Sequence, residues 1–253
     1  MSNNWTREQL ILAFNLYCKI PFGQFHERNT EVIKLARLIG RTPASVAMKL
    51  SNFVSFDPYH KARGIRGLAN ASKMDKAIWE EATNNWNVFG EESEQLLAEI
   101  SGEKIDAVSP QVPLELITKP TEAERSVKIR LGQQFFRKIV LADYDYRCCI
   151  CGMPLHKLLI ASHIVPWRDR EDLRLNPHNG LCLCALHDKA FDTGYLSVDE
   201  EYRTLVNPIV DQYLPNDAIS STLKIYAGRK IQLPEKFWPD INFIALHNQF
   251  YFS

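Results

Sequence analysis

The sequence has no net charge and no long apolar run. Its 253 residues carry 30 Lys and Arg against 30 Asp and Glu, which gives a formal net charge of zero. No stretch approaches the roughly 20 apolar residues of a membrane-spanning helix, and the polar start lacks a secretory signal pattern. These absences argue against a membrane protein and against a membrane partner. They predict a cytoplasmic protein.

Cysteine is also sparse, with six residues in the whole chain. This number is low for a disulfide scaffold of this length, so free thiols or metal ligands are expected. Four of the six form two close pairs that could hold a structural Zn²⁺ in a tetrahedron: Cys148, Cys151, Cys182 and Cys184. Because the second pair is not Cys-x-x-Cys, ordinary thiols remain the alternative.

The zero net charge hides a strong segregation along the chain. Residues 1–76 carry twelve basic against five acidic side chains, and residues 77–106 carry one basic against eight acidic side chains. Within the basic part, the glycine-containing segment 60–73 offers Arg63 and Arg66 as candidate contacts to phosphates. Since attraction to phosphates needs only a local basic patch, double-stranded DNA is the predicted partner. A merely solvated basic surface is the alternative, and homodimerisation stays open.

Residues 30–56 predict two helices separated by a turn at 40–43. Thr42 can cap the second helix, and Pro43 suits its first position. This helix should bury Val46, Leu50 and either Phe53 or Val54. It should direct three polar side chains outward: Ser45, Lys49 and Asn52. The pattern resembles a helix-turn-helix with a recognition helix for the major groove, although a plain helical hairpin would give a similar pattern.

Composition divides the chain into two expected domains. Residues 102–120 are rich in Pro and polar residues, which is typical of a linker. The expected organisation is a helical DNA-binding domain at 1–101 and a second domain at 121–253. The second domain should begin with a helix near 121–144, and it holds the most informative motifs.

Those motifs place three kinds of polar side chain at a regular spacing. His163 ends a strand-like apolar run within the stretch Ala161–Trp167, Asn179 follows 16 positions later, and Asp188 follows after another nine. A neutral imidazole can take a proton from water, and carboxylates can hold a divalent cation beside a phosphate. Asp192 would share a helical face with Asp188.

In order and in surrounding sequence, residues 121–253 resemble the restriction-type bacterial HNH endonucleases. The resemblance implies an α+β protein with a ββα-metal unit, in which His163 is the general base and Asn179 braces the loop between the two strands. Asp188 and Asp192 would hold Mg²⁺ or Mn²⁺. His187 is the alternative ligand or catalytic residue, because a shift of one residue would exchange it with Asp188. Many family members have an acidic ligand where this chain has Ser162, so water would replace that ligand.

The expected function is therefore metal-dependent hydrolysis of phosphodiester bonds in DNA. The family resemblance implies a role in restriction of foreign DNA, including modified DNA. One alternative is a helix-turn-helix DNA-binding protein whose HNH unit no longer catalyses. Another is an RNA or structure-specific nuclease, because the chemistry at phosphorus does not depend on the sugar.

Overall fold

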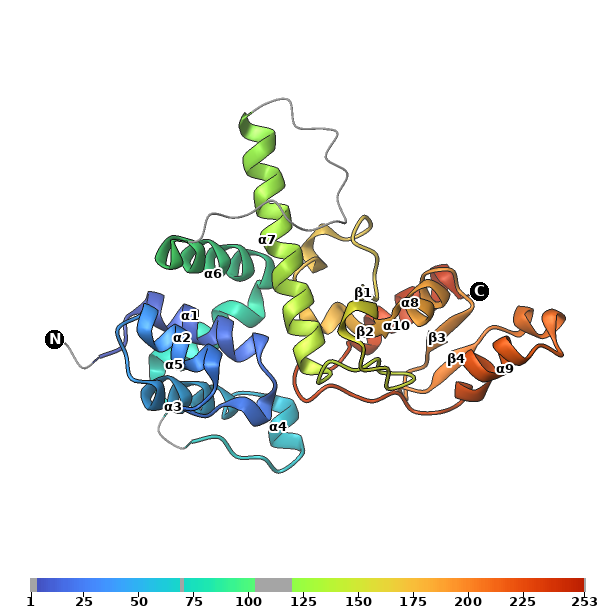
Figure 1. The fold of residues 1–253 in the computed structure, drawn as a ribbon, viewed down its shortest axis with the longest axis horizontal. Helices are drawn as coiled ribbons and strands as arrows, with labels where there is room; N and C mark the ends of the chain where they lie inside the picture. Colours follow the sequence, from blue (N-terminus) through green and yellow to red (C-terminus); the bar gives the residue numbers. More distant parts are fainter. Residues whose placement is uncertain (1–3, 69–70, 103–119, 253) are drawn as a thin grey trace. The chain divides into compact units, whose positions relative to one another are not determined.

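The computed structural model describes residues 4–68, 71–102 and 120–252. The chain divides into two compact units, Met1–Ile139 and Val140–Ser253 (Figure 1). The predicted linker falls almost wholly outside the described residues, so the domain limits expected from composition stay a prediction. No helix among the described residues combines the length and the apolar character needed to cross a bilayer.

The first unit is helical. Its helices are α1 (Arg7–Lys19), α2 (Thr30–Leu38), α3 (Pro43–Val54), α4 (Pro58–Ala62), α5 (Lys73–Asn84), α6 (Trp86–Ser101) and the start of α7 (Pro120–Asp143), with a 3₁₀ turn, η1, at Phe22–Gln24. Helix α1 contacts α2, α3, α5 and α6. Its Phe14 ring lies 5.0 Å from Phe53 and 5.3 Å from Phe89, centroid to centroid. Burial of such rings provides most of the stabilisation of a small helical core.

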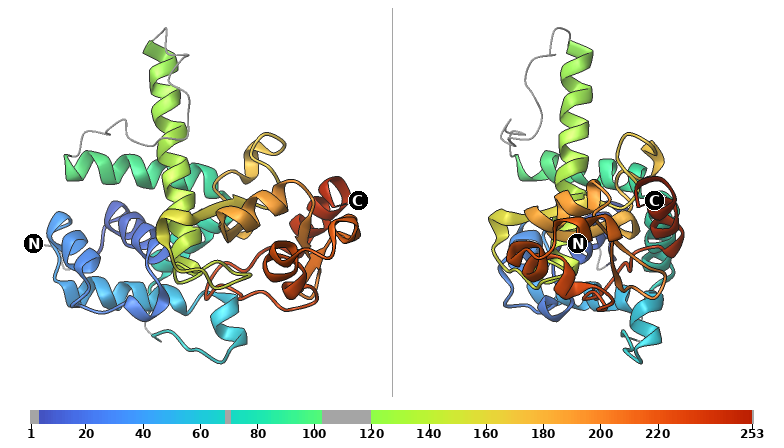
Figure 2. Two further views of the ribbon diagram at one scale, coloured as in Figure 1. Left: turned by 45° about the vertical axis from the view of Figure 1, so that its right-hand side comes forward. Right: turned by 90° about the vertical axis from the view of Figure 1, so that its right-hand side faces the viewer.

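Helix α7 continues through the boundary between the units, and both views in Figure 2 show it as one uninterrupted helix. It matches the helix expected near 121–144 within one residue at each end. On the part that belongs to the second unit, Val140 and Ala142 are buried. The helix therefore leads directly into the core of that unit.

The predicted turn between α2 and α3 is confirmed. Gly40 has a φ of 67°, which favours glycine, and Thr42 accepts a hydrogen bond from the Ser45 amide at 3.2 Å. Of the expected core positions, Val46 and Leu50 are fully buried. Phe53 and Val54 are buried as well, so the helix uses both of the alternatives.

The outward orientation expected for Lys49 and Asn52 was wrong. The Lys49 ammonium lies 2.9 Å from the Asp75 carboxylate, and Asn52 donates to the same carboxylate at 3.3 Å. All three side chains are buried. They link α3 to the start of α5, and a charge removed from water in this way requires such a partner. Ser45 is half-buried, whereas Arg63 and Arg66 are exposed.

The second unit is built on a ββα arrangement. Strand β1 (Leu159–His163) pairs antiparallel with β2 (Gly180–Cys184), with His163 opposite Gly180, and α8 (Ala185–Asp192) follows β2 directly. A second antiparallel pair, β3 (Leu196–Val198) with β4 (Thr204–Val206), comes next. The remaining helices are α9 (Asp217–Thr222) and α10 (Ile241–Tyr251), and the short 3₁₀ turns are η2 (His156–Leu158), η3 (Glu171–Leu173), η4 (Pro177–Asn179), η5 (Pro208–Tyr213) and η6 (Lys224–Tyr226).

The predicted α+β class is confirmed, since a helical first unit precedes a mixed second unit. The C-terminal tail forms α10. Before it, an isolated bridge pairs Arg203 with Lys230.

Candidate active site and metal sites

Asn179 holds the loop that follows β1. Its side-chain oxygen accepts from the Val165 amide at 2.8 Å, and its side-chain nitrogen donates to the Val165 carbonyl at 3.0 Å. The backbone carbonyl of Asn179 accepts from the Ile164 amide at 2.9 Å. Asn179 is only 1% exposed, so water does not compete for these bonds. The loop therefore leaves His163, the last residue of β1, at a fixed point.

The His163 ring is oriented by the same loop. Its Nε2 lies 3.0 Å from the Arg174 carbonyl oxygen. A carbonyl can only accept, so Nε2 carries the hydrogen and Nδ1 carries the lone pair in the neutral ring. Burial lowers the pKa of His163 to about 4. The imidazole is thus neutral at physiological pH, which is the form that can act as a base.

Two carboxylates on α8 lie one helical turn apart. Burial raises the pKa of Asp188, and the charge of Asp192 raises it further, while a hydrogen bond from Ser162 lowers it. Partial burial of its carboxyl group also raises the pKa of Asp192, although the residue as a whole is exposed. Mutual repulsion between two such groups is what a bound cation would relieve. Ser162, which occupies the position of an acid in many HNH enzymes, here lies near enough to Asp188 to lower the pKa of its carboxyl group.

A pocket of about 420 Å³ brings these elements together. It is lined by His163 from β1, by Trp167 and Arg168 from the loop, and by Lys189 and Asp192 from α8. An imidazole, an acid and two basic side chains therefore open onto one space. Basic side chains in such a space can neutralise a bound phosphate. We call this space the catalytic pocket.

A separate cluster lies at the other end of α8. Cys148, Cys151, Cys184 and His187 place their ligand atoms within 4.8 Å of one another. Measured pairs are Cys151 Sγ to Cys184 Sγ at 3.9 Å, Cys184 Sγ to His187 Nδ1 at 3.3 Å and Cys148 Sγ to His187 Nδ1 at 3.5 Å. A tetrahedral zinc with its usual bond lengths separates neighbouring ligand atoms by about 3.6–3.8 Å. The spacing thus fits Zn²⁺.

The chemistry of the cluster fits the same ion. The Nε2 atom of His187 lies 2.9 Å from the Thr222 carbonyl oxygen, so it donates there and leaves the Nδ1 lone pair toward the sulfurs. A hydrogen bond with Cys184 lowers the pKa of Cys148, which favours the thiolate form that binds metal. The corresponding hydrogen bond with Cys148 raises the pKa of Cys184 to about 11. One proton shared between two thiols explains the opposite directions.

This set differs from the one predicted, because His187 takes the place of Cys182. Alternate residues of a strand lie about 6.6 Å apart along it, and Cys182 and Cys184 both belong to β2. The sulfur of Cys182 is not among the ligand atoms that the structure groups within 4.8 Å. His187 instead stands three residues after Cys184, which precedes α8, so the first helical turn brings it over the sulfur. Both nitrogens of the His187 ring have partners in or beside this cluster, Cys184 Sγ and the Thr222 carbonyl oxygen. His187 is not among the residues that line the catalytic pocket.

His247 and Tyr251 of α10 also line the catalytic pocket. The sequence motifs assigned no functional role to either residue. No local pattern distinguishes them, because α10 begins 49 positions after the end of α8. Only the packing of α10 brings them to the pocket.

The comparisons with known proteins agree with this geometry. A family model described as HNH endonuclease matches residues 148–199, a segment that contains His163, Asn179, Asp188 and the Cys and His cluster. Residues 148–199 therefore match an HNH endonuclease domain. No curated protein matches the chain.

A solved structure described as a modification-dependent TagI restriction endonuclease shows similarity at 19% sequence identity, with a TM-score of 0.28. The match covers 45% of this chain and 36% of that chain. The matched region thus spans about a third of the length of the solved structure.

Proposed function

We propose that this protein is a metal-dependent DNA endonuclease in which His163 activates the attacking water. The observation that carries the proposal is the shared pocket: the base, the Asp192 carboxylate and the Lys189 and Arg168 side chains all line it. The bond from Nε2 to Arg174 holds the ring in the tautomer that accepts a proton at Nδ1. The alternative of a DNA-binding protein with an inert nuclease unit is not favoured, since none of these side chains is lost.

Each residue has a distinct part in the proposed reaction. His163 takes the proton of the water at Nδ1, and Asn179 keeps the loop and hence the ring in place. Lys189 and Arg168 bind the non-bridging oxygens of the phosphate. Asp188 and Asp192 would hold a divalent cation, Mg²⁺ or Mn²⁺, which when bound neutralises the charge that develops on the phosphate and on the departing oxygen.

Few protein ligands are needed for this cation. Among the described residues, the Cys and His cluster is the one group that brings three or more candidate ligand atoms within 4.8 Å of one another. Mg²⁺ usually retains several waters and is held by one or two carboxylates together with substrate phosphate. Two acids on one helix, with Ser162 beside Asp188, meet that requirement.

A structural Zn²⁺ on Cys148, Cys151, Cys184 and His187 completes the proposal. It would tie the segment before β1 to the end of β2 and the start of α8. The ββα unit is small, and small units are commonly stabilised by a metal.

The cellular role proposed is restriction of foreign DNA, including modified DNA, in the cytoplasm. Duplex DNA would be drawn to the basic part of the first unit, where Arg63 and Arg66 are exposed. Ser45 remains a candidate contact on α3. Lys49 and Asn52 are withdrawn as candidates, because they are buried against Asp75.

The test is a nicking assay on supercoiled plasmid, with the full chain freed of loosely bound metal by EDTA. Cleavage should be absent in EDTA and should return with Mg²⁺ or Mn²⁺. A matched assay on single-stranded RNA separates the alternative substrate class. Full cleavage in EDTA would contradict the role given to Asp188 and Asp192.

A further inference from the structure

A second pocket, of about 580 Å³, adjoins the catalytic pocket. Its walls come from the loop after β1 and from α10, and they consist of Val165, Pro166, Asp169, Arg170, Leu246, His247, Phe250 and Tyr251. Pro166, His247 and Tyr251 line the catalytic pocket as well. The volume lies within the roughly 300–1,000 Å³ that is typical of small-molecule sites. A ligand in this second pocket would therefore be close to a phosphate in the catalytic pocket.

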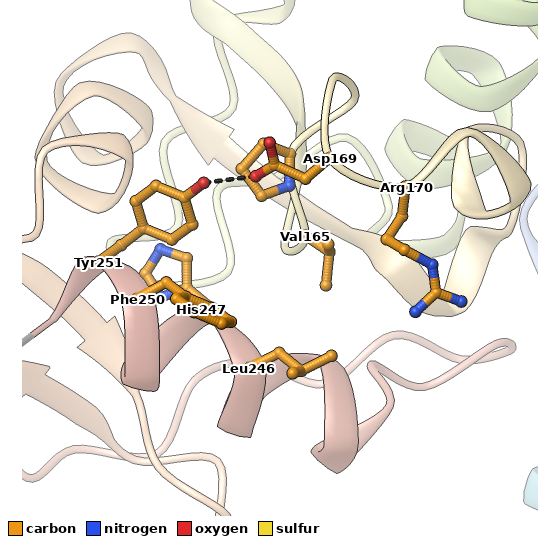
Figure 3. A pocket seen from close by; sticks show the side chains of 8 residues that line it. Val165, Asp169, Arg170, Leu246, His247, Phe250 and Tyr251 are labelled. Carbon is orange, nitrogen blue, oxygen red and sulfur yellow. Dashed lines mark hydrogen bonds between the residues drawn. The ribbon is translucent and has the colours of Figure 1, made fainter.

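The walls of this pocket are largely apolar and aromatic. Figure 3 shows the side chains of α10 on one side and those of the loop on the other, with the Tyr251 hydroxyl directed toward Asp169. The Phe250 ring is 66% exposed at the pocket. An aromatic ring this exposed is accessible for stacking with a flat ligand, and the bases of nucleic acids stack on such rings.

His247 supplies one polar atom of defined character. Asn248 donates from its side chain to the Val198 carbonyl at 2.9 Å, so its side-chain oxygen faces Ser197 and accepts the Ser197 hydroxyl. The Ser197 oxygen lies 3.1 Å from His247 Nδ1 and, having given its own hydrogen away, must accept there. Nδ1 thus carries the hydrogen, and Nε2 is an acceptor.

The Nε2 acceptor has no hydrogen bond of normal length and angle. His247 is 3% exposed, and its Nε2 atom is buried without such a bond to any described residue, although the Phe191 backbone acts on the ring. Leaving a buried polar atom unpaired is unfavourable. A ligand that brings an N–H group into the pocket would remove this cost. The amino groups of adenine and cytosine are donors of this kind.

We propose that this pocket receives a nucleobase of the cleaved DNA strand, turned out of the duplex beside the scissile phosphate. The base stacks on Phe250 and presents its amino group to His247 Nε2. This inference rests on the proposed function, because the phosphate attached to that base has to occupy the catalytic pocket. Enzymes that extrude a base read it in this way, by stacking and by hydrogen bonds to its edge.

The test uses a 5′-labelled duplex with a mapped cut site, in which one nucleotide at a time near the cut is replaced by an abasic analogue. For the wild-type chain, loss of the base at one position next to the cut should lower kcat/KM by about tenfold or more, as loss of a stacking partner does. Loss of a base several positions away should have little effect. A uniform response at all positions would overturn the proposal.

Phe250→Ala connects this effect to the pocket. The variant should cut the intact duplex about tenfold more slowly and should show no further loss on the abasic duplex, because both changes remove the same contact. Ile241→Ala is the matched control, since Ile241 is an exposed apolar residue of α10 outside the pocket. Independent, multiplying losses in Phe250→Ala would overturn the proposal.

The hydrogen bond to His247 Nε2 is tested by changing the DNA. At the sensitive position, adenine is replaced by purine, or cytosine is replaced by 2-pyrimidinone. Removal of the amino group should lower kcat/KM several-fold, and an unchanged rate would overturn the role of His247. These results are distinct from failure of the proposed function. If the wild-type chain cuts no DNA at all, the proposed function fails and the base site fails with it.

Discussion

His187 and Asp188 are neighbours on α8 but face two different sites. His187 Nδ1 lies 3.3 Å from Cys184 Sγ in the cysteine cluster, whereas the pKa of Asp188 responds to Ser162 on β1. Successive residues of a helix point about 100° apart, so one short helix can serve both sites. A metal at the cluster would fix the first turn of α8 and thereby the position of Asp188.

The zinc site predicts that metal content and stability change together. Cys151→Ser should lower bound zinc from about one ion per chain to well below that value and should lower the melting temperature, because a structural metal contributes directly to folding free energy. Zinc is measured by mass spectrometry after mild chelation. Cys182→Ser is the matched control, since Cys182 lies outside the cluster on the same strand as Cys184. Equal zinc in wild type and Cys151→Ser would reject the site.

The buried ion pair in the first unit predicts a loss of stability and not of DNA contact. Lys49→Ala leaves the Asp75 carboxylate buried without its cation, which should cost about 3–5 kcal/mol of unfolding free energy. Denaturant unfolding of the variant measures this loss. Lys49→Ala combined with Asp75→Ala should recover a large part of it.

Arg63→Ala together with Arg66→Ala should behave in the opposite way. Both side chains are exposed, so stability should change little. DNA affinity should fall, and the dependence of log Kd on log salt should become shallower by about one to two, because fewer counterions are released. An unchanged salt dependence would assign these arginines to a solvated surface.

Two histidines make the second unit sensitive to acid. Burial lowers the pKa of both His163 and His247 to about 4, from an ordinary value of 6.5. Protons therefore bind the unfolded chain more readily, and the stability due to each neutral ring is complete above pH 6.5 and is lost as the pH falls from 6.5 toward 4. The loss could reach roughly 3 kcal/mol for each ring. Thermal unfolding between pH 7 and 4 measures it.

His247→Phe should reduce this acid dependence, because it keeps the stack on Phe191 but removes the titrating group. His26→Gln is the matched control, since His26 is exposed. If His26→Gln reduces the acid dependence as strongly as His247→Phe does, the assignment to the buried rings is incorrect.

The sequence predicted most of the fold where the signals were local. Thr42 caps α3 through a bond within one helical turn, so the residues at the start of that helix were sufficient to predict it. The spacing of His163, Asn179 and Asp188 likewise indicated the ββα unit. Helix α6 was not predicted, because its many acidic residues dominated the interpretation of that segment.

The remaining differences depend on packing between distant segments. Whether Lys49 points to solvent or inward is decided by Asp75, which lies 26 residues later on another helix. Whether Cys182 or His187 joins the metal cluster depends on where β2 ends and α8 begins. The place of His247 beside the catalytic pocket depends on α10. None of these relationships has a local pattern from which it could be predicted.

The proposed role of His163 is tested most directly by single-turnover cleavage of plasmid DNA by His163→Ala in Mg²⁺ or Mn²⁺. Removal of a general base should lower the rate by about two to four orders of magnitude. DNA affinity and bound zinc should be unchanged, because His163 contributes to neither site. Cleavage by His163→Ala at a rate close to that of the wild type would contradict the account.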